Sequence, residues 1–208
     1  MGTHKEGDSM APVLGICGSA RKSGNTATLL RAALTATDME SELVFLSDLT
    51  IGFCTGCLSC MKNKGRCIKD DDMSWLLDKM LEAQALVLGS PNYYYDVSGL
   101  TKNMIDRSIA ASYLGIGEYT GMEWHGWRPF YEKVGGVIIC QAAFGAEKAL
   151  ETFKRFCEYS GLTLIGDVIA AVGNQSAADF PEYIEEARQL GGKIKAAIER
   201  KQISRKNL

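Results

Sequence analysis

Four cysteines gather in one short stretch, at Cys54, Cys57, Cys60 and Cys67. Two-residue gaps allow a wrapped backbone to aim successive thiolates at one small centre, and an iron–sulfur cubane needs four such thiolates. Basic residues nearby would offset the negative charge of a thiolate-ligated cluster: Lys62, Lys64, Arg66 and Lys69. The spacing therefore favours an iron–sulfur cluster as the chemistry of this stretch.

Three other interpretations of these cysteines stay open. Zinc usually takes two Cys-x-x-Cys pairs separated by a longer spacer, which the even spacing here fits less well. A dithiol–disulfide centre could use Cys54 and Cys57, the nearest Cys-x-x-Cys pair. The loop could also be chemically inert, although clustering of cysteines argues against that.

A second stretch whose residue types could bind a ligand covers residues 12–26. The apolar run Val13 to Cys17 predicts a buried strand, and a helix is expected from Thr26 onward. Small and hydroxyl-bearing residues fill the turn between them, so backbone N–H groups and the helix dipole could hold a phosphate. The turn has neither the P-loop lysine nor the Gly-x-Gly-x-x-Gly pattern of dinucleotide sites. It suits the terminal phosphate of a mononucleotide such as FMN, although an ordinary strand–helix turn with capping Ser and Asn remains the alternative.

Five repeats of a strand followed by a helix position these stretches. Expected strands cover 13–17, 42–47, 85–89, 134–140 and 162–172, and expected helices cover 26–34, 70–81, 99–112, 146–159 and 181–200. Short, continuously apolar strands alternating with helices predict an α/β fold, a doubly wound five-stranded parallel sheet with helices on both faces. The strand order 2-1-3-4-5 is the common solution, and it brings the loops after strands 1, 3 and 4 together.

Those three loops carry complementary residue types. The loop at 90–97 offers amide and aromatic groups from Asn92, Tyr93 and Tyr94, and the loop at 141–145 offers Phe144 and Gly145. A flat isoalloxazine ring needs hydrogen-bonding groups at its pyrimidine edge and aromatic cover on its face. The combined loops therefore predict a flavin site.

The motif Gly18-Ser19-x-Arg21-x-x-Gly24-Asn25-Thr26 resembles the phosphate loop of the flavodoxin-like NAD(P)H-dependent FMN reductases. The run Ser90-Pro91-x-Tyr93-x-x-x-Val97-Ser98-x-x-x-Lys102-x-x-Ile105-Asp106-Arg107 resembles their isoalloxazine loop and the following helix. The resemblance covers about residues 12–200 and implies FMN as the cofactor. It assigns the phosphate and ring contacts to Ser19, Arg21, Ser23, Asn25, Thr26, Pro91, Asn92, Tyr93 and Tyr94.

The cysteine stretch following strand 2 resembles that of the iron–sulfur flavoproteins, a group within the same superfamily. The resemblance implies a [4Fe–4S] cluster held by Cys54, Cys57, Cys60 and Cys67, and a homodimer or homotetramer that passes electrons between the cluster and FMN. A ferredoxin-type donor would be the partner, and no side chain need act as a catalytic acid or base. A cluster-free NAD(P)H-dependent FMN or quinone reductase is the alternative, and a non-enzymatic redox or metal sensor is the third interpretation.

Composition sets the remaining expectations. The net charge of −2 and pI near 5.8 give no general attraction to nucleic acid, and no apolar run is long enough to cross a membrane. Seven cysteines, an odd number, favour a reducing cytoplasm. We expect a tail at 1–11 and a single FMN-binding domain at 12–208 with a cysteine-rich loop at 48–70. The aromatic segment 115–131 is expected to be a flap or a subunit contact.

Overall fold

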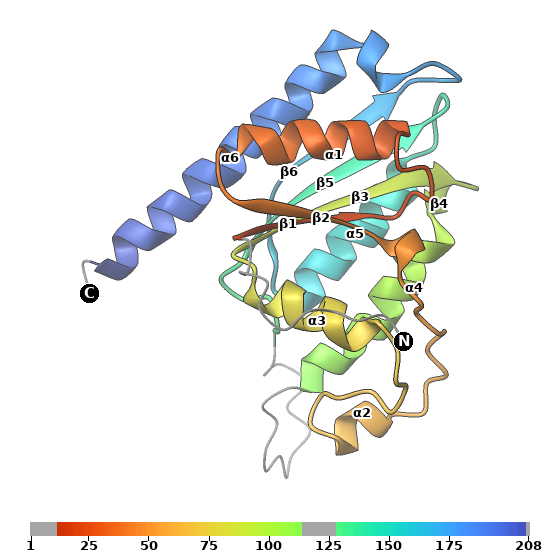
Figure 1. Ribbon diagram of the computed structural model, residues 1–208, viewed down its shortest axis with the longest axis vertical. Helices are drawn as coiled ribbons and strands as arrows, with labels where there is room; N and C mark the ends of the chain where they lie inside the picture. The colour runs from red at the N-terminus through yellow and green to blue at the C-terminus, as the bar shows by residue number, and fades with distance from the viewer. Residues whose placement is uncertain (1–11, 114–127, 207–208) are drawn as a thin grey trace.

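A parallel β-sheet forms the centre of the protein (Figure 1). The computed structural model describes residues 12–113 and 128–206. The sheet's main strands are β1 (Val13–Cys17), β2 (Ser41–Phe45), β3 (Ala85–Tyr93), β5 (Val134–Gln141) and β6 (Thr163–Ala171). They run in the order β2-β1-β3-β5-β6 with every neighbouring pair parallel, which confirms the predicted doubly wound fold. A short strand, β4 (Asp96–Val97), pairs antiparallel with the end of β3.

Helices cover both faces of the sheet (Figure 1). One face carries α1 (Asn25–Ala36) and α6 (Pro181–Lys206), and the other carries α3 (Met73–Glu82), α4 (Gly99–Arg107) and α5 (Glu147–Ser160). Alternation along β1 supplies the two cores, because successive side chains point to opposite faces. Val13 and Cys17 enter the core under α1 and α6, whereas Leu14 and Ile16 enter the other core.

Several boundaries differ from the sequence prediction. The turn α2 (Ser59–Lys62) interrupts the cysteine-rich loop, and the expected helix 99–112 divides into α4 and the 3₁₀ segment η2 (Ser108–Tyr113). Two further 3₁₀ turns, η1 (Leu46–Asp48) and η3 (Ala177–Asp179), follow β2 and β6. The expected helix at 70–81 begins at Met73, because the Asp71 side chain accepts from the Met73 and Gly52 N–H groups before the helix starts.

Two predicted segments fall largely outside the described residues. These are the tail at 1–11 and most of the aromatic segment 115–131. Within the described part of the chain, none of the helices combines the length and apolar character needed to cross a membrane.

Candidate cofactor sites

The loop after β1 is pressed against neighbouring backbone at Gly18. The Gly18 N–H donates to the Gly89 carbonyl at 2.7 Å, and the Gly18 carbonyl accepts from Ser98 Oγ at 2.7 Å. A Cβ added at Gly18 would lie 1.8 Å from Thr101 Oγ1, so only glycine fits here without displacing α4. The loop that could hold a phosphate is therefore anchored both to the end of β3 and to the first turn of α4.

The start of α1 carries no side-chain cap from the described residues. Ser19 Oγ instead accepts from the Arg21 N–H at 3.2 Å. The Asn25 side chain does not cap α1 either, because its Nδ2 donates to the Gln175 carbonyl at 3.0 Å and its Oδ1 accepts from the Ala177 N–H at 2.8 Å. The arrangement leaves the first N–H groups of α1 available to an anion, as the phosphate interpretation requires.

A cavity of about 650 Å³ opens at this edge of the sheet. Predicted residues on its wall are Ser19, Arg21, Ser23, Asn25, Thr26, Pro91, Asn92 and Tyr93. The loop after β6, residues 172–176, also lines it and was not predicted. Its position after a strand of the same parallel sheet was the available signal, because the carboxyl ends of all these strands share one edge.

Asn92 carries an unusual polar group in this cavity. Its Oδ1 is buried without a hydrogen-bond partner among the described residues, while its Nδ2 donates to Gln141 Oε1 at 3.5 Å. An orphaned buried acceptor costs about 1–3 kcal/mol, so it fits a ligand that brings a donor. The N–H-bearing pyrimidine edge of a flavin is such a ligand, and the cavity volume falls within the range of cofactor pockets, about 300–1,000 Å³.

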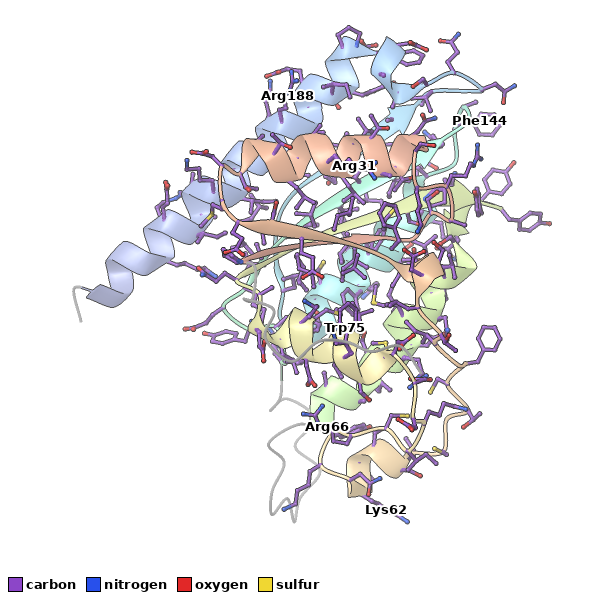
Figure 2. All side chains as sticks on the ribbon, in the orientation of Figure 1. Arg31, Lys62, Arg66, Trp75, Phe144 and Arg188 are labelled. Atoms are coloured by element: carbon purple, nitrogen blue, oxygen red, sulfur yellow. The ribbon has the colours of Figure 1, made fainter. Side chains whose placement is uncertain are left out.

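Tyr94 and Tyr95 form the tight turn between β3 and β4. Both have left-handed backbones, with φ of 49° and 66° respectively, a conformation that strains non-glycine residues. Tyr94 is 97% exposed, and the Tyr95 ring lies 6.4 Å from that of Phe144, which Figure 2 shows at the surface. Gly145, with φ of 91°, leaves space for Tyr95, since a Cβ there would lie 2.3 Å from the ring. Tyr94, Phe144 and Gly145 lie outside the cavity lining, beside it.

The four clustered cysteines share a second cavity, of about 860 Å³. Cys54, Cys57, Cys60 and Cys67 all line it, and all seven cysteines of the chain are free thiols. Burial raises the pKa of Cys60, and the neighbouring Cys67 and Cys54 contribute in the same direction to a smaller extent. Across 12–113 and 128–206, no three His, Cys, Asp or Glu side chains converge closely enough to hold a metal ion.

The cysteines divide into two chemical classes. Hydrogen bonding from Ser59 lowers the pKa of the exposed Cys57 to about 7, which favours the thiolate that metals and electrophiles require. Burial raises the pKa of Cys140 and of Cys157 to about 12. The buried Cys140 and Cys157 are packing groups, whereas Cys57 in the loop is chemically competent.

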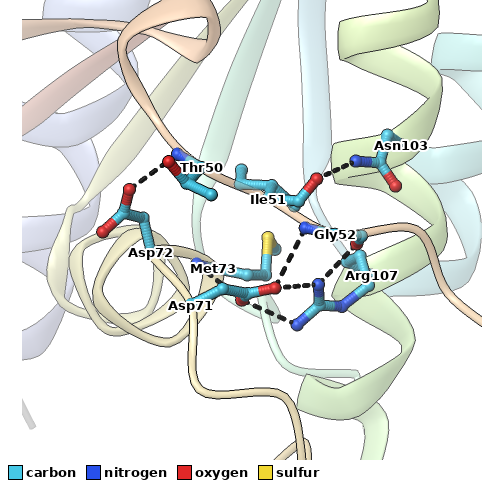
Figure 3. Close-up of polar contacts among 8 residues, drawn as sticks. All are labelled: Thr50, Ile51, Gly52, Asp71, Asp72, Met73, Asn103 and Arg107. Atoms are coloured by element: carbon cyan, nitrogen blue, oxygen red, sulfur yellow. Dashed lines mark hydrogen bonds and ion pairs between the residues drawn. The ribbon is translucent and has the colours of Figure 1, made fainter. Parts of the chain in front are cut away.

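Arg107 joins the two ends of the cysteine segment (Figure 3). Its guanidinium donates to both carboxylate oxygens of Asp71, at 2.6 and 2.9 Å, and to the Gly52 carbonyl at 2.6 Å. Asp71 also accepts from the Gly52 N–H at 3.0 Å, so Gly52 is held through both its backbone groups. Burial would raise the pKa of Asp71, but the Arg107 hydrogen bonds and charge outweigh burial and lower it.

This fold and the cavity at its carboxyl edge define a flavodoxin-like protein, and comparison with known proteins gives its family. The NADPH-dependent FMN reductase family matches residues 11–177, and the chain belongs to that family. An iron–sulfur flavoprotein of Archaeoglobus fulgidus is 34% identical over 193 residues, covering 90% of this chain and 80% of the relative. An iron–sulfur flavoprotein of Methanocaldococcus jannaschii is 32% identical over 200 residues, covering 89% and 96% respectively.

Solved structures agree on the fold. A flavone reductase superimposes with a TM-score of 0.69 at 24% identity, covering 90% of this chain, and the present chain spans 62% of that protein's length. An azoreductase from Bacillus anthracis gives a TM-score of 0.58 at 15% identity, covering 90% of this chain and 98% of the other. These structures agree with the fold, and the family assignment makes the protein an FMN-dependent oxidoreductase.

Proposed function

We propose that the protein transfers electrons between a [4Fe–4S] cluster held by Cys54, Cys57, Cys60 and Cys67 and an FMN held at the carboxyl edge of the sheet. The observation that carries the proposal is the placement of four free thiols along one cavity wall. Their number and chemistry fit a four-thiolate cluster. Since no three of the described ligands yet converge, cluster binding would be accompanied by closure of the loop.

FMN, when bound, exchanges electrons singly or in pairs, and the chain supplies binding and orientation. The uncapped start of α1, with Ser19, Arg21 and Thr26 beside it, would hold the phosphate. Asn92 Oδ1 would accept from the ring edge, and the exposed tyrosines would shield the ring from solvent. Asn25 contributes by tying the loop after β6 to α1, because its side chain is already occupied there.

We propose further that the working unit is a homodimer or homotetramer. The two cavities have no lining residue in common within the described chain, so a second copy offers a route that brings a cysteine segment to a flavin cavity. Exposed apolar side chains occur beside both cavities, on the cysteine segment at Phe53, Leu58 and Ile68 and on the tyrosine turn. Large apolar side chains exposed on a surface are typical of contacts between subunits, so these residues support the proposal. Analytical ultracentrifugation of the loaded protein tests this, and a monomer at micromolar concentration would contradict it.

A ferredoxin-type one-electron carrier is the proposed external partner, and the reducing cytoplasm the proposed compartment. Lys62 extends from the cysteine segment in Figure 2, and Lys69 lines its cavity, so this surface presents positive charge to an acidic carrier. The rate of reduction by ferredoxin should fall steeply with ionic strength, because electrostatic steering is screened by salt. A rate that does not change between low and high salt would contradict this docking surface.

The decisive experiment measures iron, acid-labile sulfide and flavin in protein purified without oxygen. A four-iron cluster predicts about four of each inorganic element per FMN. Cys57→Ala should lose iron while retaining FMN, and the matched control Cys157→Ala, which removes a buried packing thiol, should keep both. A full complement of iron in Cys57→Ala would overturn the ligand assignment.

A direct NADPH-dependent reductase is the second candidate, and the family's description favours it. In that case hydride passes from the nicotinamide to FMN without an iron centre. Iron-free protein carrying FMN should then oxidise NADPH rapidly and reduce a quinone. Slow oxidation of NADPH by that preparation, with rapid reduction of cluster-loaded protein by ferredoxin, would decide for the electron-transfer function.

A further inference from the structure

Arg107 is the most deeply buried charged residue near the cysteines. Its side chain is 1% exposed, and its partner Asp71 is 10% exposed. Buried guanidinium groups are stable only when their donors are satisfied, because the charge has been removed from water. Four of the five N–H groups of a guanidinium lie on the two terminal nitrogens, and here those nitrogens face Asp71 and the Gly52 carbonyl.

The fifth N–H group, on Nε, has no such partner. Arg107 Nε is buried without a hydrogen-bond acceptor among the residues that the structure describes. Arg107 and Cys67 line the same cavity, and the Cys67 sulfur lies close enough to Arg107 to interact with its guanidinium. An orphaned donor therefore lies beside the last cysteine of the cluster motif.

We infer that Arg107 is a positioning residue for the iron–sulfur cluster, which closes the cysteine segment through Gly52 and Asp71 and leaves its Nε–H group for the sulfur of Cys67. This inference rests on the proposed cluster function. Hydrogen bonds to ligand sulfurs and nearby positive charge stabilise the reduced, more negative state of a cluster, so Arg107 raises the reduction potential.

The position of Arg107 also explains why the two ends of the segment stay together. Asn103, one turn earlier on α4, donates to the Ile51 carbonyl at 2.8 Å, and Arg107 holds Gly52 beside it. Residues four apart lie on one face of a helix, so a single face of α4 fixes the loop segment that leads into Cys54 (Figure 3). Asp71 fixes the loop segment that follows Cys67.

The test compares Arg107→Gln with Asp71→Asn in protein that carries FMN and a reconstituted cluster. Both variants weaken the same buried pair, but they change local charge in opposite directions. Arg107→Gln should lower the midpoint potential of the cluster by about 59 mV. For a one-electron couple, this shift reduces the ratio of reduced to oxidised cluster about tenfold at a fixed solution potential. Asp71→Asn should leave the potential unchanged or raise it, because it removes a negative charge.

Arg107→Lys provides the conservative variant if Arg107→Gln does not fold. It retains the charge without the fork of donors, so it should hold the potential closer to wild type while binding less iron per FMN. Potentials that fall equally in the Arg107 and Asp71 variants would show a purely structural role and overturn the inference. So would a wild-type potential in Arg107→Gln. Wild-type protein that holds FMN but no iron or sulfide would instead refute the proposed function itself, and the inference with it.

Discussion

The buried pair between Asp71 and Arg107 gives the sharpest stability prediction. Asp71→Asn leaves the Arg107 charge 1% exposed without its counter-charge and disturbs a carboxylate that accepts from Gly52 and Met73 as well. Breaking a buried pair from one side costs about 3–5 kcal/mol of unfolding free energy. With a urea m-value of about 2 kcal/mol/M, the unfolding midpoint should fall by about 1.5–2.5 M.

The pH dependence of this loss has a defined sign. Because the folded pKa of Asp71 lies below its unfolded value of about 3.9, the carboxylate's contribution is fully present above pH 4 to 5. It is lost as pH falls through the folded pKa, so wild type and Asp71→Asn should converge in acid. Urea unfolding followed by far-UV circular dichroism between pH 7 and pH 3 measures both quantities.

The matched control is Asp106→Asn, which breaks the Lys102–Asp106 pair on the exposed face of the same helix. Both partners are about half exposed, so the loss should stay within about 1 kcal/mol. Equal losses in the two variants, or a gap between wild type and Asp71→Asn that does not change down to pH 3, would refute the view that burial makes the Asp71 pair strong.

Three further variants test the flavin cavity. Asn92→Ala removes the orphaned acceptor and should weaken FMN binding, measured by flavin fluorescence, about 10-fold or more, whereas the exposed Asn63→Ala should not change it. Gly18→Ala should lower the free energy of unfolding in urea by about 1–3 kcal/mol and reduce FMN retention, because the added methyl group meets Thr101. An unfolding midpoint equal to that of wild type would contradict this contact. Tyr94→Gly should stabilise the apoprotein by about 1 kcal/mol in thermal unfolding, because glycine adopts the left-handed backbone of this position without strain. A loss of stability would show that the exposed tyrosine ring makes contacts that outweigh the strain.

Much of the fold was predictable because the strands are short, apolar and regularly interrupted. The run Val13 to Cys17 has no polar residue, and it is buried on both faces as a central parallel strand should be. Because the candidate site follows strand ends, the strand pattern predicts Ser19, Arg21 and Asn92 at one edge of the sheet, and these residues line one cavity there.

The missed features depend on contacts between residues far apart in sequence. Arg107 looks like an ordinary basic residue at the end of a helix, and only packing shows that it is buried against Asp71, 36 positions away. The role of Asn25 was missed for the same reason, because its partners Gln175 and Ala177 are about 150 positions away. Local patterns predict which residues begin a helix, but they carry no signal for such long-range partners.

Helix α4 connects the two candidate sites, and its length fixes the distance between them. Its N-terminal cap, Ser98, holds Gly18 of the phosphate loop, and its last residue, Arg107, holds the cysteine segment. Nine residues at 1.5 Å each span about 13 Å, and each residue turns the helix by about 100°. Deleting a single residue would rotate Arg107 away from Asp71 while Ser98 stayed in place. The two sites therefore constrain the length of this helix more tightly than the sequence of its exposed face.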